Sequence, residues 1–122
     1  LDRHYRPGQI QVKLENPPFE DGAADVLVYG LSLYGTSEDL RTYLEKAARI
    51  LRPGGHLYIV EPASSFSDEG LRRFLEGLEA LGFELVGAPK RLFVPSGGEL
   101  VTLHLSLTGE RREVTAEFFV RK

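Results

Sequence analysis

The sequence contains no cysteine, no methionine and no tryptophan. Without cysteine there is no disulfide bond, no thiolate metal site and no cysteine nucleophile. No apolar run reaches the roughly 20 residues that a membrane-spanning helix needs, and no signal peptide is recognisable, so we expect no membrane partner. Because the chain begins with Leu1 and has no methionine, we expect it to be a fragment or processed piece of something longer.

The composition is that of a globular protein. Of the 122 residues, 42% are hydrophobic and 27% are charged, which excludes a disordered chain and fits one domain with a real core. The net charge of −3 argues against a strongly basic nucleic-acid-binding surface, although a local basic patch is compatible with it. We expect a cytoplasmic protein, and the glutamate- and arginine-rich composition is compatible with a thermophilic source.

One stretch, Asp25 to Val60, organises the chain. The apolar run Asp25–Leu33 predicts a strand, Ser37 to about Arg52 has the spacing of an amphipathic helix, and Leu57–Val60 predicts a second strand. A turn at Pro53-Gly54-Gly55 returns the chain from the helix to the second strand. The stretch therefore predicts a βαβ unit, and its uninterrupted apolar runs indicate parallel strands that are buried on both faces.

The flanking segments extend this unit into a layered α/β sheet. Residues 1–8 are expected to be a linker or loose end, and the alternating Gln9–Leu14 predicts a half-exposed edge strand. The later predictions are a helix begun by Ser67 or Asp68 and ended by Gly82, a strand at Phe83–Gly87 with a continuation at Leu92–Val94, and an antiparallel hairpin of Leu100–Leu107 and Val114–Val120. The order β-β-α-β-α-β-β-β favours parallel strands with an antiparallel end and helices on the sheet faces.

Four short motifs between residues 18 and 62 form a recognisable set. They are Pro18-Phe19-Glu20-Asp21-Gly22, Asp25-Val26-Leu27-Val28, the run AARILRPGG from Ala47 to Gly55, and Ile59-Val60-Glu61-Pro62. The set resembles the carboxyl-terminal half of class I S-adenosylmethionine-dependent methyltransferases. The segment Leu31–Thr36 is most similar to the ribosomal-RNA-processing, nucleomethylin-like members. The resemblance covers roughly residues 12–88, and it implies a partial Rossmann-like fold with residues 9–122 as the methyltransferase-like domain.

The cofactor half of that family is missing from this sequence. No Gly-x-Gly-x-Gly follows an early apolar strand, and the pairs Gly54-Gly55 and Gly97-Gly98 are expected to be turns because neither opens a helix. Where the family commonly has an aspartate for the adenine amino group, this chain has Lys13, which donates hydrogen bonds but does not accept them; Glu15 could replace it. We therefore expect no cofactor for this chain alone, and S-adenosylmethionine if the domain is active.

The tetrapeptide Asn16-Pro17-Pro18-Phe19 has two interpretations. It matches the motif of amino-group methyltransferases in which the asparagine and a proline carbonyl accept hydrogen bonds from the target amine and the ring stacks on a flipped base. That motif follows a central strand, whereas Gln11 and Lys13 on the preceding strand would be costly to bury. The pattern favours coincidence over a target-amine site.

The ends of the two organising strands supply the candidate site residues. If the domain is active, the resemblance assigns cofactor contacts to Glu15, Leu31 and Ser32, and substrate contacts to Tyr34, Glu61 and Ser64. No residue is predicted to be catalytic, and none to hold a metal. The alternatives are that Tyr34 is a half-buried packing aromatic and that Glu61 is a solvated strand end. The three histidines have no metal-ligand spacing and are expected at the surface, with His104 facing outwards.

Two functions of different classes are compatible with these features. The first is a degenerate methyltransferase-like domain that serves as an interaction or dimerisation module of a larger protein, because a second copy commonly covers an exposed sheet edge. The second is the carboxyl-terminal half of an active methyltransferase acting on RNA or a small molecule, with donor and acceptor held in line. The expected partners are a second copy or the rest of a longer chain, with nucleic acid reached through the parent protein.

Overall fold

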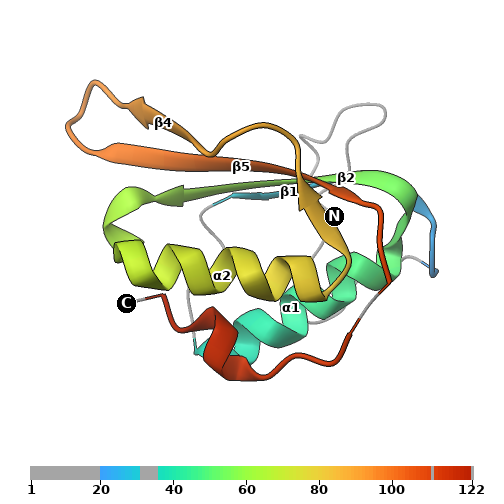
Figure 1. Cartoon of the computed structure of the whole chain (residues 1–122). Helices are drawn as coiled ribbons and strands as arrows, with labels where there is room; N and C mark the ends of the chain where they lie inside the picture. The colour runs from blue at the N-terminus through green and yellow to red at the C-terminus, as the bar shows by residue number, and fades with distance from the viewer. Residues whose placement is uncertain (1–19, 31–35, 111, 122) are drawn as a thin grey trace.

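The computed structural model, which describes residues 20–30, 36–110 and 112–121, has one mixed sheet with two α-helices against it (Figure 1). In chain order the elements are β1 (Ala24–Gly30), α1 (Ser37–Ile50), β2 (Leu51–Pro62), the 3₁₀ turn η1 (Ala63–Ser65), α2 (Asp68–Ala80), β3 (Phe83–Leu85), β4 (Lys90–Phe93), β5 (Glu99–Leu107) and the 3₁₀ turn η2 (Ala116–Phe119). The strand order is β1-β2-β5-β3, and β4 also pairs with β5. The predicted α/β class is confirmed, whereas the predicted linker 1–8 and strand Gln9–Leu14 lie outside the described residues.

The predicted β1-α1-β2 unit is present, with β1 and β2 parallel. A capping box begins α1: the Thr36 hydroxyl accepts from the Asp39 amide at 3.1 Å, and the Thr36 amide donates to the Asp39 carboxylate at 3.3 Å. Residues buried at helical spacing, Leu40, Leu44, Ala47 and Ile50, face the sheet. Local signals in the sequence therefore account for both the start of the helix and the face that it buries.

The Pro53-Gly54-Gly55 turn is built into the first part of β2 as an irregularity. The register with β1 shifts between Ala24 and Val26, so β2 carries extra residues there. Gly54 has a φ of +83°, and a Cβ on Gly55 would lie 2.9 Å from the Arg52 carbonyl oxygen. Only glycine allows the backbone to bend so closely at this point.

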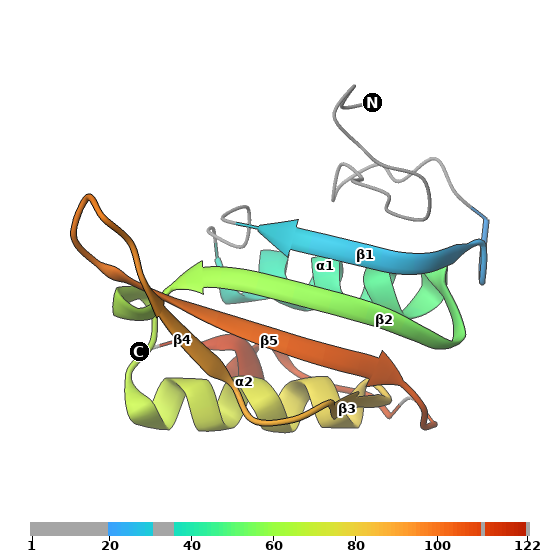
Figure 2. The same ribbon diagram turned by 90° about the horizontal axis from the view of Figure 1, so that it is seen from above.

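The two faces of the sheet are covered differently. The face against the helices is fully buried and consists of Leu27, Tyr29, Leu57, Ile59, Glu61, Val101, Leu103 and Leu105. The open face, so named here, alternates with it and consists of Val26, Val28, His56, Tyr58, Val60, Thr102, His104 and Ser106, all of intermediate exposure. Figure 2 shows both described α-helices behind the same side of the strands. Burial on both faces, as the apolar runs predicted, is not present within the described part of the chain.

The antiparallel hairpin consists of β4 and β5 rather than of Leu100–Leu107 and Val114–Val120. The first of these predicted strands is correct, since β5 spans Glu99–Leu107. The second is wrong, because its residues form η2 and extended backbone below the helices (Figure 1). Its apolar residues fill a gap between helices instead of pairing with a strand: Phe119 is buried and its ring meets Phe74 edge-on at 5.6 Å.

The second helix follows its predicted limits. The Ser67 hydroxyl accepts from the Gly70 amide at 2.9 Å and caps α2. Gly82, with a φ of +99°, ends the helix by donating to the Glu79 carbonyl at 3.0 Å. Its own carbonyl accepts from the amides of Thr108 and Gly109, which fixes the end of β5 against the end of α2.

We expect Gly77→Ala to destabilise the protein by about 1–3 kcal/mol, the usual range for overpacking a core. A Cβ at this position of α2 would lie 2.7 Å from the Phe119 ring and 2.8 Å from the Phe118 Cβ. The cost of this clash exceeds the roughly 1 kcal/mol by which alanine stabilises a helix interior relative to glycine. Chemical denaturation measures the loss, with Glu76→Ala on the exposed side of the same helix as the control. Unchanged stability in Gly77→Ala would contradict the close packing of η2 on α2.

Candidate functional site

The carboxyl ends of β1 and β2 lie side by side and form the edge where ligands bind in open α/β sheets. Gly30 pairs with Val60, and β2 continues through Glu61 and Pro62 into η1. The loop after β1, residues 31–35, lies outside the described residues. Four predicted site residues, Glu15, Leu31, Ser32 and Tyr34, together with the tetrapeptide at positions 16–19, fall in the parts not described.

Glu61 lies on the helix side of β2, not in solvent. It continues the alternation of Leu57 and Ile59, and it is only 2% exposed. Its Oε1 lies 3.9 Å from a guanidinium nitrogen of Arg121, which the extended backbone after η2 brings over the start of α2. The Arg121 carbonyl accepts from the Ser67 amide at 2.9 Å and fixes this crossing. The alternative of a solvated strand end is therefore wrong, whereas a substrate contact of Glu61 stays a prediction.

Ser64 is exposed on η1, one turn before the cap of α2. Its hydroxyl thus lies at the carboxyl edge as predicted, but on the surface and away from the buried Glu61. Tyr29 is also buried near this edge; its hydroxyl donates to the Tyr43 carbonyl at 3.3 Å, and burial raises the pKa of that phenol. Tyr29 is held as a neutral packing residue with a satisfied hydroxyl.

The residues to which the resemblance assigns cofactor contacts, Glu15, Leu31 and Ser32, lie outside the described residues, so binding of S-adenosylmethionine by this chain stays a prediction. At the carboxyl edge within the described residues, the Glu61 carboxylate faces the helices and Arg121, and the Ser64 hydroxyl is exposed.

Two histidines that the sequence left scattered meet on the open face. His56 Nδ1 lies 3.0 Å from His104 Nε2, and the His104 ring stacks on Tyr58 with centroids 4.3 Å apart. Burial lowers the pKa of His104, and the positive charges of His56 and Lys90 lower it further. The pair comes from adjacent antiparallel strands, in which Tyr58 is opposite His104. The alternation along β5 predicted that His104 faces away from the core, and the structure agrees. Its contact with His56 could be predicted only from the register between β2 and β5.

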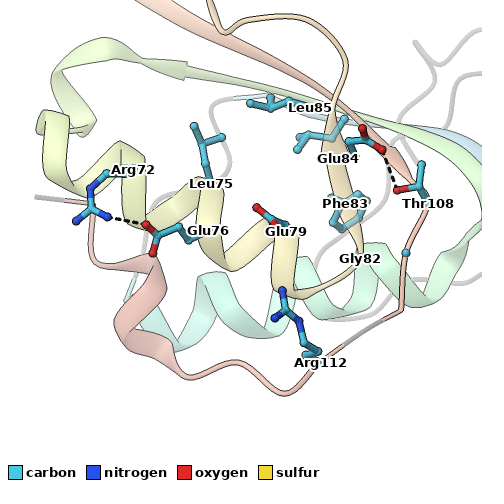
Figure 3. A pocket seen from close by; sticks show the side chains of 12 residues that line it. Arg72, Leu75, Glu76, Glu79, Gly82, Phe83, Glu84, Leu85, Thr108 and Arg112 are labelled. Carbon is cyan, nitrogen blue, oxygen red and sulfur yellow. Dashed lines mark hydrogen bonds and ion pairs between the residues drawn. The ribbon is translucent and has the colours of Figure 1, made fainter.

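A groove of about 640 Å³ lies beside α2 and β3 (Figure 3). Several carboxylates that line the groove already accept hydrogen bonds from neighbouring side chains. Arg72 donates to Glu76 at 2.6 Å, and the Thr108 hydroxyl donates to Glu84 at 3.4 Å. The groove lies where β3 pairs with the end of β5. The neighbouring part of β2, around His56, is the part that precedes its carboxyl end. The groove therefore lies away from the carboxyl edge of the parallel strands.

Two further kinds of site receive no support within residues 20–30, 36–110 and 112–121. These residues contain no group of three or more histidine, aspartate or glutamate side chains that could hold a metal ion. In the same ranges no helix has the length and apolar character needed to cross a membrane.

Comparison with known proteins gives one family and a consistent set of relatives. The model of a family described as "Hypothetical methyltransferase" matches residues 6–92. Ribosomal RNA-processing protein 8 of Rattus norvegicus is 45% identical over 69 residues, which are 57% of this chain and 14% of that protein. The 25S rRNA (adenine(645)-N(1))-methyltransferase of Schizosaccharomyces pombe is 41% identical over 75 residues, 62% of this chain and 23% of that protein. The chain thus spans less than a quarter of these two curated relatives.

Solved structures confirm the fold. A SAM-dependent methyltransferase from Thermotoga maritima superposes with a TM-score of 0.61 at 20% identity, covering 81% of this chain and 63% of that one. The 1,6-didemethyltoxoflavin-N1-methyltransferase of Burkholderia thailandensis, solved with S-adenosylhomocysteine, superposes with a TM-score of 0.61 at 19% identity, covering 72% of this chain and 45% of that one. The layered sheet is therefore that of class I methyltransferases.

We expect Arg121→Ala to lower the free energy of unfolding by about 1–3 kcal/mol, because the buried Glu61 carboxylate loses a nearby cation. Denaturant titration measures the change. Arg112→Ala is the matched control, since that side chain is exposed and has no ion pair with a buried acid. Equal, small effects of both substitutions would show that Arg121 does not stabilise the Glu61 carboxylate.

We expect acid to destabilise the protein partly through His104. Its folded-state pKa is lowered, so as pH falls through the ordinary histidine pKa of about 6.5 the unfolded chain takes up the proton first. The melting temperature should therefore fall below pH 7, and less so in His104→Gln. His56→Gln should raise the pKa of His104 by removing one positive neighbour, as an NMR titration would show. A His104 that titrates at or above the ordinary value would contradict this assignment.

Proposed function

This chain belongs to the methyltransferase family whose model matches residues 6–92, and from that premise we propose that it is the acceptor-side half of an RNA-modifying methyltransferase domain. It contributes the carboxyl edge of β1 and β2. It docks through its open face onto the rest of a larger protein and does not hold S-adenosylmethionine by itself. The proposal thus combines an interaction role within a larger protein with a cofactor that another part of that protein holds.

The observation that carries the proposal is the open face, on which no α-helix of the described residues packs. Apolar side chains at its β1 end, Val26, Val28 and Val60, are left with intermediate exposure, and no described helix packs on them. In α/β folds helices normally cover both faces of the parallel part of a sheet. A face of this kind is a binding surface for another polypeptide.

The acceptor class comes from the relatives. One is named as a ribosomal-RNA-processing protein and another as an rRNA adenine-N1 methyltransferase, so an RNA base is the acceptor that they support. The two solved methyltransferases extend beyond the region that this chain matches, which supports a cofactor half contributed by another segment. The cytoplasmic location and the thermophilic source stay predictions.

A second candidate function is a degenerate module in which a copy of the same chain covers the open face. The same half-buried valines favour it, because an isologous contact between two open faces would bury them symmetrically. This candidate needs neither a cofactor nor RNA. It differs from the first in the identity of the covering polypeptide.

We expect calorimetric titration of this chain with S-adenosylmethionine to give no heat at millimolar ligand, because the described carboxyl edge lacks the groups that would hold it. Micromolar binding by the isolated chain would sink the proposal that the cofactor depends on another polypeptide. S-adenosylhomocysteine serves as the parallel ligand. Unchanged thermal unfolding in both ligands gives an independent readout.

Sedimentation separates the two candidates. The degenerate module predicts a dimer at micromolar concentration that Val28→Glu on the open face converts to a monomer, since the substitution buries an unpaired charge in the contact. Glu79→Lys on the exposed side of α2 is the matched control and should leave the dimer intact. A monomer at all concentrations contradicts the second candidate and leaves the open face to the rest of a larger protein.

A further inference from the structure

The β4–β5 hairpin carries the most exposed large apolar side chains of the described residues. Phe93 is 80% exposed and Leu92 is 59% exposed. Figure 1 shows the hairpin extending past the end of β2 and away from the helices. A phenylalanine held almost entirely in water contributes little to the core of this chain, so its place at the hairpin end suggests contact with a partner.

The strand register places the hairpin end at the functional edge of the sheet. Pro62, the last residue of β2, pairs with Leu100 of β5. Residues 94–98, which precede β5, therefore extend beyond the carboxyl end of β2, on the same side as η1 and Ser64 (Figure 2). A molecule bound at the carboxyl edge would lie next to this hairpin.

The end of the hairpin is a closed turn and not a loose loop. The Gly97 amide donates to the Val94 carbonyl at 3.0 Å, and the Val94 amide donates to the Gly98 carbonyl at 3.2 Å. Pro95 occupies the position of the turn that favours its fixed φ, and Gly97 and Gly98 supply the positive φ values. The backbone directly after Phe93 is therefore fixed before any ligand arrives, which lowers the entropic cost of binding.

The hairpin presents one cation, Arg91, on the same face as the exposed ring. Arg91 and Phe93 alternate onto one face, where Arg91 donates to Glu99 at 2.7 Å. Lys90 and Leu92 alternate onto the other face, opposite Thr102 and Leu100. The ring is followed by Val94 and then by the turn. Single-stranded RNA is recognised by flat exposed rings for unstacked bases together with cations for the flanking phosphates, and Phe93 and Arg91 supply one of each.

We propose that the β4–β5 hairpin is an RNA-contacting arm in which Phe93 stacks on an unpaired base and Arg91 contacts an adjacent phosphate. This inference rests on the proposed function, since it assumes that the acceptor is RNA. It also goes beyond the family match, which ends at residue 92 and leaves Phe93 and the turn outside. The arm brings single-stranded RNA to the carboxyl edge of the sheet.

Phe93→Ala tests the ring. We expect it to weaken binding of a fluorescent single-stranded oligoribonucleotide to the 122-residue chain about tenfold, the usual effect of removing one base–aromatic stack. Phe93→Tyr should retain the affinity. Leu92→Ala is the matched control: it removes another exposed apolar side chain, on the opposite face, and should change binding less than twofold. All three substitutions are at exposed positions and should leave the melting temperature unchanged.

Two substitutions test the cation. Glu99→Gln removes the carboxylate that competes with RNA phosphate for Arg91 and should strengthen RNA binding. Arg91→Ala should weaken binding and make the slope of log affinity against log salt shallower by about 0.7, the increment for one lost phosphate contact.

Three outcomes would overturn the inference. The first is no RNA binding up to about 100 µM protein at low salt, where even non-specific binding is measurable. The second is an equal loss in Phe93→Ala and Leu92→Ala, which indicates a generic apolar contact such as a protein partner. The third is a duplex that binds as well as the single strand. Because the readout needs neither cofactor nor methyl transfer, a failure here leaves the proposed function standing, and a failure of methyl transfer leaves RNA binding by the arm unaffected.

Discussion

The structure depends on the pairing of β2 with two neighbours, β1 on one side and β5 on the other. That pairing is parallel with β1 and antiparallel with β5, so β2 is the place where the sheet changes direction. It also divides the side chains of β2 into two sets, because alternate residues point to opposite faces. Leu57, Ile59 and Glu61 go to the helices, while His56 and Tyr58 go to the open face. The buried core and the histidine pair follow from that alternation, and the half-buried valines follow from the same alternation in β1 and β2.

Much of this architecture was predictable because its signals are local. The helical spacing of Leu40, Leu44 and Ala47, the capping residues Thr36 and Ser67, and the helix-ending Gly82 each act within a few positions of themselves, and the structure agrees with them. The predicted strand at Leu57–Val60 is also correct. The observed strand β2, Leu51–Pro62, is longer than predicted, and its first part is irregular. Short-range physics thus accounts for the β1-α1-β2-α2 part of the fold.

The errors concern residues whose state is decided by distant partners. The apolar residues near Val114 and Phe119 suit a strand and a buried turn equally well, and the gap between α1 and α2 selects the turn. The histidine pair needs the β2–β5 register, because 48 positions separate His56 from His104. For Glu61 a usable signal did exist: it shares the parity of Leu57 and Ile59, so alternation alone places it on the helix side. Four other predicted site residues, Glu15, Leu31, Ser32 and Tyr34, lie outside the described part of the chain.

The docking of η2 against both helices has a consequence for the order of events during synthesis. Phe119 closes the core between α1 and α2, yet it follows every strand and α-helix in the chain. Until η2 has emerged from the ribosome, the helix layer retains an apolar cavity beside Phe74 and Gly77. A nascent chain exposes this apolar surface until residues 116–119 emerge, and this is the interval in which it would engage a chaperone or aggregate.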